Sequence, residues 1–248
     1  MIRTIIIVLS VLFTAPLWAQ EKEYKPEDTE VWEPVPKIVT PGEGNNPPSD
    51  AIVLFDGTNL DEWMVEMEGK WVIEDGVVTI HELPEGENKP YNLKSKRKFG
   101  SMQLHIEWRA PDVVEGEGQG RGNSGVFIQE RYEVQVQDNY DNPTYVNGQA
   151  GAIYKQSPPL VNACKKPGEW QTYDIFYTAP EFDEIGIVSK PAYITVVHNG
   201  VLIQNHTEIK GTIQYIGLPC YEPHGPASIV LQDHGNPVSF RNIWVRSL

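Results

Sequence analysis

The sequence predicts an all-β protein built as a two-sheet antiparallel sandwich, and three observations support this class. Short runs of alternating apolar and polar residues, separated by turn residues, follow one another from Ala51 to the C-terminus. Two turns, Asp75-Gly76 and Asn199-Gly200, are strong hairpin signals because both of their positions require positive φ. No segment beyond a turn or two has a helical period. Many antiparallel strands over ~200 residues are typical of a sandwich or a barrel, and we choose the sandwich.

The chain begins with the layout of a secretory signal peptide. Arg3 precedes an apolar run from Ile5 to Phe13, and Ala19 ends a small-residue region. The run is shorter than the ~20 residues that cross a bilayer as a helix. We expect a leader at residues 1–19, cleavage after Ala19, and an exported protein that is periplasmic or secreted. No later segment is apolar enough for a membrane span.

Residues 20–49 are rich in Pro, Glu and Gly without periodicity, which predicts an extended lead-in to a domain at 50–248. Along that domain, the strand candidates are "AIVLFD", "WVIEDGVVTI", "SMQLHIEWRA", "SGVFIQE", "YEVQVQD", "WQTYDIFYTA", "AYITVVHNGVLIQNH", "ASIVLQDH" and "VSFRNIWVRSL". The formal net charge of −14 becomes −15 when Arg3 leaves with the leader (−14 − 1). Such an acidic surface repels nucleic acid and anionic membranes, so neither is expected as a partner.

The two cysteines, Cys164 and Cys220, lie in Pro- and Gly-rich loop sequence. In an oxidising compartment they can form a disulfide, or both can remain unpaired, because sequence does not give their separation. No cofactor is evident. Metal-binding spacing such as "HExxH" and the "GxSxG" nucleophile elbow are both absent from the sequence. Calcium bound by loop oxygens stays open, since Asp and Asn are plentiful in the loops.

Three strands carry polar side chains at alternating positions, which places them on one face of each strand. The solvated side of an ordinary sheet shows the same alternation. However, residues 101–154 contain no Lys, which a wet strand face commonly uses, and carboxylates with His suit acid–base chemistry. We therefore favour a ligand-binding face. The three sets are His105, Glu107 and Arg109; Glu133, Gln135 and Gln137; and Gln232 with His234.

The glycine-rich stretch "EGEGQGRGNSGV" lacks the Lys and the following helix of a phosphate-binding loop, so we interpret it as a loop at the rim of the groove. Asn123 enters the next strand from this loop. Asp138 ends its strand and either reaches the groove or caps the following loop. Tyr154 follows a loop and is a candidate for stacking on a sugar ring.

Several blocks of the chain resemble, in order, the signature blocks of the 3-keto-disaccharide hydrolase family, formerly a domain of unknown function. They are "LFDGTNLDEW", "WVIEDGVV", "RGNSGVFIQERYEVQVQD", "GQAGAIY", "KPGEWQTYDI", "VVHNGVLIQNH" and "IVLQDHGNPVSFRNIWVR". The resemblance implies a jelly roll of the concanavalin A-like and glucanase type that binds sugar on its concave face. It also implies cleavage of glycosides whose sugar has been oxidised to a ketone at carbon 3, and hence a functional partnership with a sugar 3-dehydrogenase.

The chain lacks the "ExDxxE" strand of the laminarinase-type glucanases, because Gln135 stands where a carboxylate would be needed. A 3-keto sugar offers another route, in which a base removes the proton on carbon 2, the aglycone is expelled, and water adds. We expect Glu133 or Glu107 to be the base and Arg109, Gln135 or His234 to stabilise the enolate. The other carboxylate or His234 would protonate the leaving group. His105 either takes part or only orients Glu107.

Two other functions fit the same residues. A non-catalytic carbohydrate-binding module would use a polar groove on the same fold. An ordinary glycoside hydrolase would act on unoxidised glucans, although the amide at position 135 argues against it.

Overall fold

The computed structural model describes residues 24–81 and 89–248, so the expected leader at 1–19 lies outside the described residues. The described residues divide into two units, 24–38 and 39–248, with the second unit lacking a description of residues 82–88. In the first, the described part is largely exposed and contains one short 3-10 helix, η1 (Pro26–Thr29). The second unit holds all the described strands and begins at Val39, so it includes the last eleven residues of the expected lead-in.

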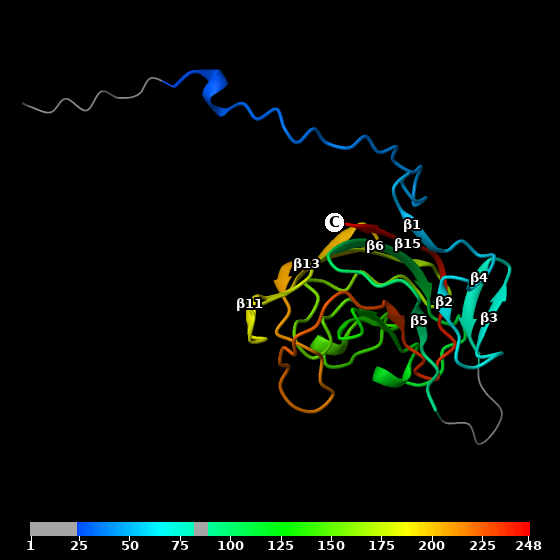
Figure 1. Ribbon diagram of the computed structural model, residues 1–248. Helices are drawn as coiled ribbons and strands as arrows, with labels where there is room; N and C mark the ends of the chain where they lie inside the picture. The colour runs from blue at the N-terminus through cyan, green and yellow to red at the C-terminus, as the bar shows by residue number, and fades with distance from the viewer. Residues whose placement is uncertain (1–23, 82–88) are drawn as a thin grey trace, which may run out of the picture. The chain divides into compact units, whose positions relative to one another are not determined.

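Residues 39–248 form the predicted antiparallel sandwich, which confirms the fold class (Figure 1). The larger sheet has the order β13-β12-β9-β6-β15-β4-β3, and β1 also pairs with β15. Its strands are β1 (Ile52–Phe55), β3 (Trp71–Glu74), β4 (Val77–Ile80), β6 (Met102–Arg109), β9 (Gln171–Thr178), β12 (Tyr193–His198), β13 (Val201–Glu208) and β15 (Ser239–Ser247).

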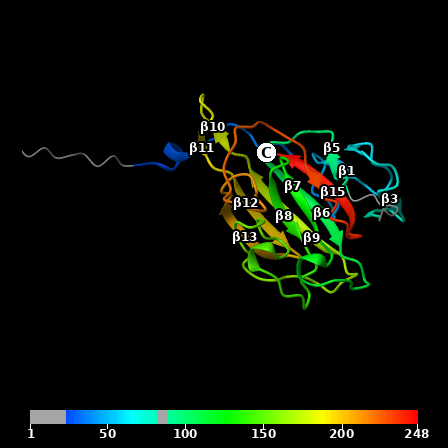
Figure 2. The same ribbon diagram turned by 90° about the horizontal axis from the view of Figure 1, so that it is seen from below.

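The smaller sheet has the order β2-β5-β14-β7-β8. Its strands are β2 (Trp63–Met64), β5 (Leu93–Ser95), β14 (Val230–Leu231), β7 (Ser124–Ile128) and β8 (Tyr132–Val136). A two-stranded ribbon joins β10 (Glu181–Phe182) to β11 (Val188–Lys190), and two 3-10 turns, η2 (Gly118–Gly120) and η3 (Val146–Gly148), lie in loops. Figure 2 shows β7 and β8 in a layer over β6 and β9.

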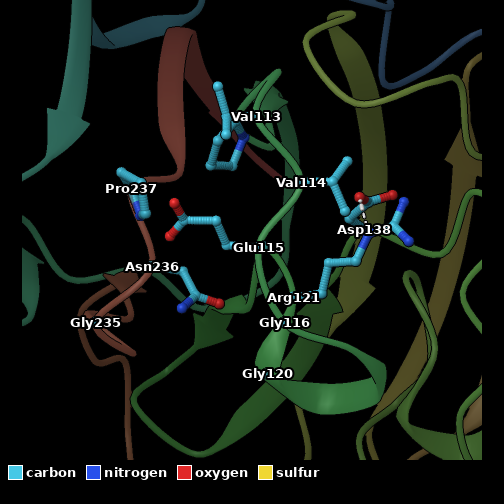
Figure 3. A pocket seen from close by; sticks show the side chains of 12 residues that line it. Val113, Val114, Glu115, Gly116, Gly120, Arg121, Asp138, Gly235, Asn236 and Pro237 are labelled. Atoms are coloured by element: carbon cyan, nitrogen blue, oxygen red, sulfur yellow. Dashed lines mark hydrogen bonds and ion pairs between the residues drawn. The ribbon is translucent and has the colours of Figure 1, made fainter.

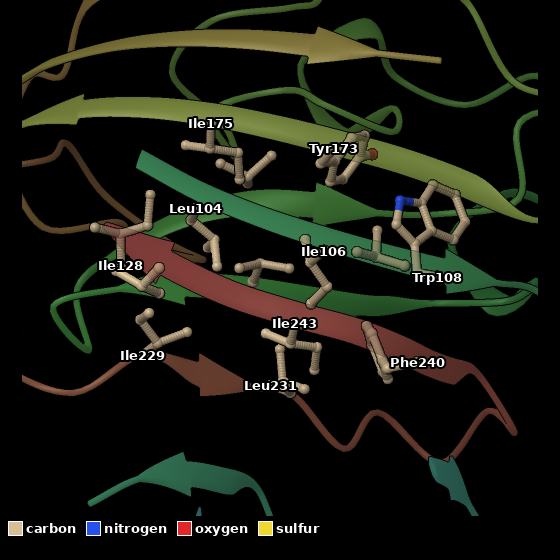
Figure 4. Close-up of a cluster of buried hydrophobic side chains, with 14 of the residues drawn as sticks. Leu104, Ile106, Trp108, Ile128, Tyr173, Ile175, Ile229, Leu231, Phe240 and Ile243 are labelled. Atoms are coloured by element: carbon tan, nitrogen blue, oxygen red, sulfur yellow. The ribbon is translucent and has the colours of Figure 1, made fainter. Parts of the chain in front are cut away.

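The core fills the space between the two sheets. Leu104, Ile106 and Trp108 of β6 are fully buried and face Ile128 and Leu231 of the smaller sheet (Figure 4). On each strand, therefore, every second side chain points into this core, and the side chains between them point outward. In each sheet, the outward parity carries the polar residues noted in the sequence.

Both predicted hairpins are present. Asp75 and Gly76 join β3 to β4 with φ of 50° and 75°, and Asn199 and Gly200 join β12 to β13 with φ of 52° and 80°. Asparagine and aspartate tolerate this left-handed region better than other side chains, which is why these dipeptides predict the turns. The two-residue strands β2 and β10 and the three-residue strands β5 and β11 were not predicted, because so few residues show no alternation.

Candidate active site

A pocket of about 260 Å³ lies on the outward face of the smaller sheet, and we call it the central pocket. Strands β7, β8 and the end of β14 form its floor, and the segments around Tyr154 and Tyr215 form its walls. Six of the residues predicted from sequence meet here. The lining consists of Asn123, Phe127, Glu133, Gln135, Tyr154, Ile213, Tyr215, Gln232 and His234.

Glu133 is the one carboxylic acid among the described residues that line the central pocket. Its side chain is only 3% exposed and has no hydrogen-bond or ion-pair partner within residues 24–81 and 89–248. Burial raises the pKa of Glu133 to about 8, because a charged carboxylate loses its hydration there and gains no compensating partner. A carboxyl group with such a pKa exchanges a proton near neutral pH, which general acid–base catalysis requires.

Gly125 makes room for this carboxyl group. On β7, Gly125 pairs with Gln135 and Phe127 pairs with Glu133, so the Glu133 side chain leans across the neighbouring strand. A methyl group at position 125 would collide with Glu133 Oε1 and approach Phe127 Cε2 to 3.0 Å. Glycine is needed here for space rather than for backbone conformation, since its φ is not positive.

Amide side chains form a fixed network beside Glu133. Gln135 Nε2 donates to Asn123 Oδ1 at 2.9 Å, and Asn123 Nδ2 donates to the Gln119 carbonyl at 2.7 Å. Gln135 Oε1 is buried and has no hydrogen-bond partner in the described chain. These bonds hold the two amides rigidly at the pocket floor, which favours recognition of a polar ligand in a single pose.

Tyrosine side chains form one wall of the central pocket. The Tyr154 hydroxyl lies 2.7 Å from the Tyr145 hydroxyl, and burial together with this bond raises the pKa of Tyr154. Lys155 Nζ donates to the Tyr215 carbonyl at 2.8 Å and lies 4.2 Å from the Tyr215 ring centroid. Tyr215 as a whole residue is 72% exposed, and it presents an aromatic side chain at the mouth of the pocket.

His234 lies on a turn that a buried ion pair holds in place. Lys70 Nζ lies 3.1 Å from Asp233 Oδ2, and both side chains are almost fully buried. Asp233 also accepts the backbone N–H of Tyr91 at 2.9 Å and that of Gly235 at 3.0 Å. A buried pair with these additional bonds fixes the turn, so the exposed His234 next to it has a defined backbone position.

The structure does not bring His105, Glu107 and Arg109 into this site, which corrects the expected grouping. All three are on β6, which belongs to the larger sheet, and their parity is outward from that sheet. They therefore lie on the opposite face of the sandwich from Glu133. Alternation identifies the side chains that face away from a core, but it does not tell which of the two sheets carries them.

Glu107 has a structural role on that opposite face. Arg241 Nε donates to Glu107 Oε2 at 2.6 Å, and the side-chain amides of Asn45 and Asn242 donate to Oε1 at 3.1 and 3.0 Å. Burial alone would raise the pKa of Glu107, but these three bonds lower it. The carboxylate thus pins the segment around Asn45 to β15 and stays ionised.

The other two β6 residues are occupied as well. His105 Nδ1 lies 2.7 Å from Asp174 Oδ1, and its ring stacks on Trp244 with centroids 5.2 Å apart. The Arg109 guanidinium lies 4.8 Å from the Trp170 ring centroid. Neither contact involves the central pocket.

Gln137 and Asp138 lie beyond the end of the central pocket. Gln137 Nε2 donates to the carbonyls of Gly118 and Arg121 at 2.6 Å each, so this amide supports the loop above it. Asp138 Oδ2 accepts from Arg121 Nε at 2.6 Å, and its Oδ1 accepts the Tyr140 N–H at 3.1 Å. Asp138 therefore both caps the following loop and lines a neighbouring cleft.

Cys164 and Cys220 are free thiols, so the alternative without a disulfide is the one found. Among the described residues, no group of three or more His, Cys, Asp or Glu side chains could hold a metal ion, and no helix is long and apolar enough to cross a bilayer. The pocket residues that the sequence did not reveal are Phe127, Ile213 and Tyr215. Phe127 lies on the same face of β7 as Gly125, so strand alternation could have predicted it. Tyr215 lies in a loop, where no periodicity helps.

The β-sandwich therefore carries a polar outward pocket with one buried carboxyl group that has no partner in the described chain, and a carbohydrate-active enzyme is compatible with this arrangement. Residues 50–246 match the family described as the 3-keto-alpha-glucoside-1,2-lyase-like domain, and the chain belongs to this family. The family resemblance inferred from the sequence blocks is thereby confirmed.

Two relatives support this assignment. The chain is 26% identical over 235 residues to a 3-keto-disaccharide hydrolase from Bacteroides thetaiotaomicron, covering 79% of this chain and 78% of that protein. It is also similar to a crystal structure of a candidate glycosyl hydrolase from Parabacteroides distasonis, with 50% identity, a TM-score of 0.83, and coverage of 90% of this chain and 97% of the other. A second structure of that description from the same organism has 18% identity and a TM-score of 0.58, covers 80% of this chain and 94% of the other, and shows the shared fold.

Proposed function

We propose that this protein is an exported enzyme that cleaves the glycosidic bond of 3-keto-glycosides, including disaccharides, by proton abstraction at carbon 2. The observation that carries the proposal is the buried Glu133 carboxyl group, which has no partner in the described chain and lies in the central pocket. Burying an unpaired carboxyl group costs several kcal/mol. Recognition of a neutral sugar does not require that cost, whereas a general base with a raised pKa does.

The substrate's ketone makes this single base sufficient. A carbonyl at carbon 3 acidifies the hydrogen on carbon 2, and Glu133 takes this proton while the electron pair forms an enolate. The enolate re-forms the carbonyl, a double bond forms between carbons 1 and 2, and the bond from carbon 1 to the aglycone oxygen breaks. Water then adds across the double bond of the enone. The net change is hydrolysis, with no covalent bond between the sugar and the enzyme.

The neighbouring side chains supply the other roles. His234, at the edge of the pocket, protonates the departing oxygen. Gln232 provides a donor toward the enolate oxygen, since its side-chain amide has no partner in the part of the chain that the structure describes. Asn123, Gln135 and Tyr154 bind the sugar hydroxyl groups through amide and phenol groups.

An ordinary retaining glycosidase is less consistent with this pocket. That mechanism needs two carboxyl groups about 5 to 5.5 Å apart. Among the described residues that line the central pocket, Glu133 is the one carboxylic acid. The elimination route needs only one.

The expected context follows from the same chemistry. The leader at residues 1–19 would export the protein to the periplasm or the medium. The ketone must come from an oxidation at carbon 3, so a sugar 3-dehydrogenase would act before this enzyme.

The first experiment compares a 3-keto-glucoside with its unoxidised parent, using release of the aglycone as the readout. We expect release from the keto compound only, and a loss of at least about a thousandfold in kcat for Glu133→Gln. The matched control is Glu107→Gln, a buried glutamate on the opposite face, which should retain its activity. Cleavage of the parent glucoside would indicate an ordinary glycosidase. Binding without any cleavage would indicate a carbohydrate-binding module.

A further inference from the structure

A second cleft of about 360 Å³, which we call the side cleft, opens next to the central pocket. Its two walls are the loop 111–122 and the turn 235–237. Figure 3 shows the side chains of Glu115 and Asn236 directed into the space between these walls, while the Arg121–Asp138 ion pair lies at its far side. The side cleft contains none of the residues to which the proposed reaction assigns a role.

The side cleft and the central pocket share a boundary. Asn123 of the central pocket follows Gly122 of the side cleft, and His234 of the central pocket precedes Gly235 of the side cleft. At this boundary, the Asn123 backbone N–H donates to Asn236 Oδ1 at 2.6 Å, which ties the two segments together. The side cleft and the central pocket therefore adjoin each other at two places in the chain, between Gly122 and Asn123 and between His234 and Gly235.

The two hollows also lie in line along the strands. In the pairing of β7 with β8, Glu133 lies opposite Phe127 and Gln135 lies opposite Gly125. Asp138, which lines the side cleft, lies five positions after Glu133 in the chain, and its backbone N–H donates to the Arg121 carbonyl. At ~3.3 Å per residue the extended segment covers at most roughly 16 Å, of which β8 supplies the part up to Val136, and this is farther than a single sugar ring reaches from a base at its carbon 2. A ligand that fills both hollows must consist of more than one ring.

We propose that the side cleft is the leaving-group subsite, which binds the second sugar of a disaccharide whose oxidised ring lies over Glu133. The inference rests on the proposed function. His234 lies where the two hollows meet, which is where the bridging oxygen of such a disaccharide would lie.

The composition of the side cleft fits a neutral sugar ring. Val114 and Pro237 offer apolar surface to the C–H face of a ring, and Val114 is 50% exposed. Glu115 and Asn236 offer acceptors and donors to its hydroxyl groups. Arg121 is held by its bonds to Asp138 and to the Tyr140 carbonyl, so it shapes the cleft wall rather than attracting an anion. The subsite thus favours a hydroxyl-rich, uncharged leaving group.

The test fills the side cleft without touching Glu133. Val114→Trp adds an indole to the cleft, and Val161→Trp is the matched control, because Val161 is also 50% exposed but lines neither hollow. Each variant is assayed with a 3-keto-disaccharide and with methyl 3-keto-glucoside, whose leaving group is too small to enter the side cleft. We expect Val114→Trp to lower kcat/KM for the disaccharide at least tenfold and to change that for the methyl glycoside less than twofold. Val161→Trp should change neither.

A second variant tests the same subsite in case Val114→Trp does not fold. Glu115→Ala, at an exposed position, should also raise the KM for the disaccharide and leave the methyl glycoside unaffected. Equal losses on both substrates, or no loss on either, would overturn the subsite. The subsite would also be overturned if Tyr215→Ala, but not Val114→Trp, lowered the activity on the disaccharide alone. That result would place the second sugar at the opposite end of the central pocket. If the unmodified enzyme released nothing from either substrate, the proposed function itself would fail, and that result is distinct from these.

Discussion

At the scale of single residues, Glu133 combines two properties that oppose each other energetically. It is almost fully buried, and no group in the described chain stabilises its charged form. Burial raises the pKa of Glu133 to about 8, so its carboxyl group stays protonated up to about that pH. An ordinary glutamate has a pKa of 4.5. Both the activity and the stability of the protein should therefore depend on pH over this window.

The activity should increase with pH. If Glu133 is the base, only its ionised form reacts, so kcat/KM should rise up to about pH 8 and then level off. A pH–rate profile on methyl 3-keto-glucoside measures this. A profile that is already flat from pH 5 upward would rule out Glu133 as the base.

The stability should change in the opposite direction. Between pH 4.5 and about 8 the folded protein holds a proton on Glu133 that the unfolded chain has released, so the free energy of unfolding falls as the pH rises. The slope is at most roughly 1.4 kcal/mol per pH unit. Glu133→Gln should remove this contribution, which makes the variant more stable than the parent at pH 8 and similar to it at pH 4. Urea unfolding at both values compares them, and parallel curves would contradict the assignment.

Gly125 gives a second test at this scale. Gly125→Ala should displace the Glu133 carboxyl group, with a loss of activity of about a hundredfold and little loss of stability, because the clashing atom ends a side chain. Gly100→Ala is the control, since open space surrounds that position. Aglycone release and the melting temperature are the readouts. Full activity in Gly125→Ala would show that the carboxyl position is not critical.

At the scale of elements, the segment from Val39 to Asp50 is held against the outward face of β15 and β6. Asn242 adopts a positive φ of 46° at the bulge of β15, and its amide donates to Glu107 and to the Asn45 carbonyl. Asp50 adds a two-pronged ion pair with Arg246 at 2.7 and 2.9 Å. Covering β6 with this segment explains why polar side chains on an outward face are buried.

Removing the anchor should therefore affect folding rather than chemistry. Glu107→Ala breaks three charge-assisted hydrogen bonds and should lower the free energy of unfolding by about 2 to 3 kcal/mol. Chemical denaturation measures this change. The folded fraction should retain its kcat. A Glu107→Ala protein that is fully folded but inactive would show that Glu107 takes part in catalysis.

At the scale of the whole molecule, the sandwich is stabilised by its core without a covalent cross-link. Cys164 and Cys220 are free, and burial raises the pKa of Cys164 to about 12, which makes its thiol unreactive. The melting temperature should consequently be the same with and without a thiol reductant. A fall of several degrees on reduction would show that the two residues are bonded in solution.

Much of this molecule could be predicted from its sequence. The two hairpins followed from Asp75-Gly76 and Asn199-Gly200, since few other dipeptides adopt two successive positive φ values. The alternation in "YEVQVQD" correctly separated Val134 and Val136, which face the core, from Glu133 and Gln135, which line the pocket. Family-specific blocks then identified the family, because these local patterns are carried by the chain itself.

Only the tertiary structure decided which polar strands share a site. His105 and Glu107 show the same alternation as Glu133 and Gln135, yet they lie on the other side of the sandwich. Periodicity is a property of one strand, whereas the assignment of a strand to a sheet depends on pairing between residues far apart in the chain. For the same reason, the sequence determined that Glu133 faces away from the core, and the structure determined that it lies over Gly125, buried and with no partner in the described chain.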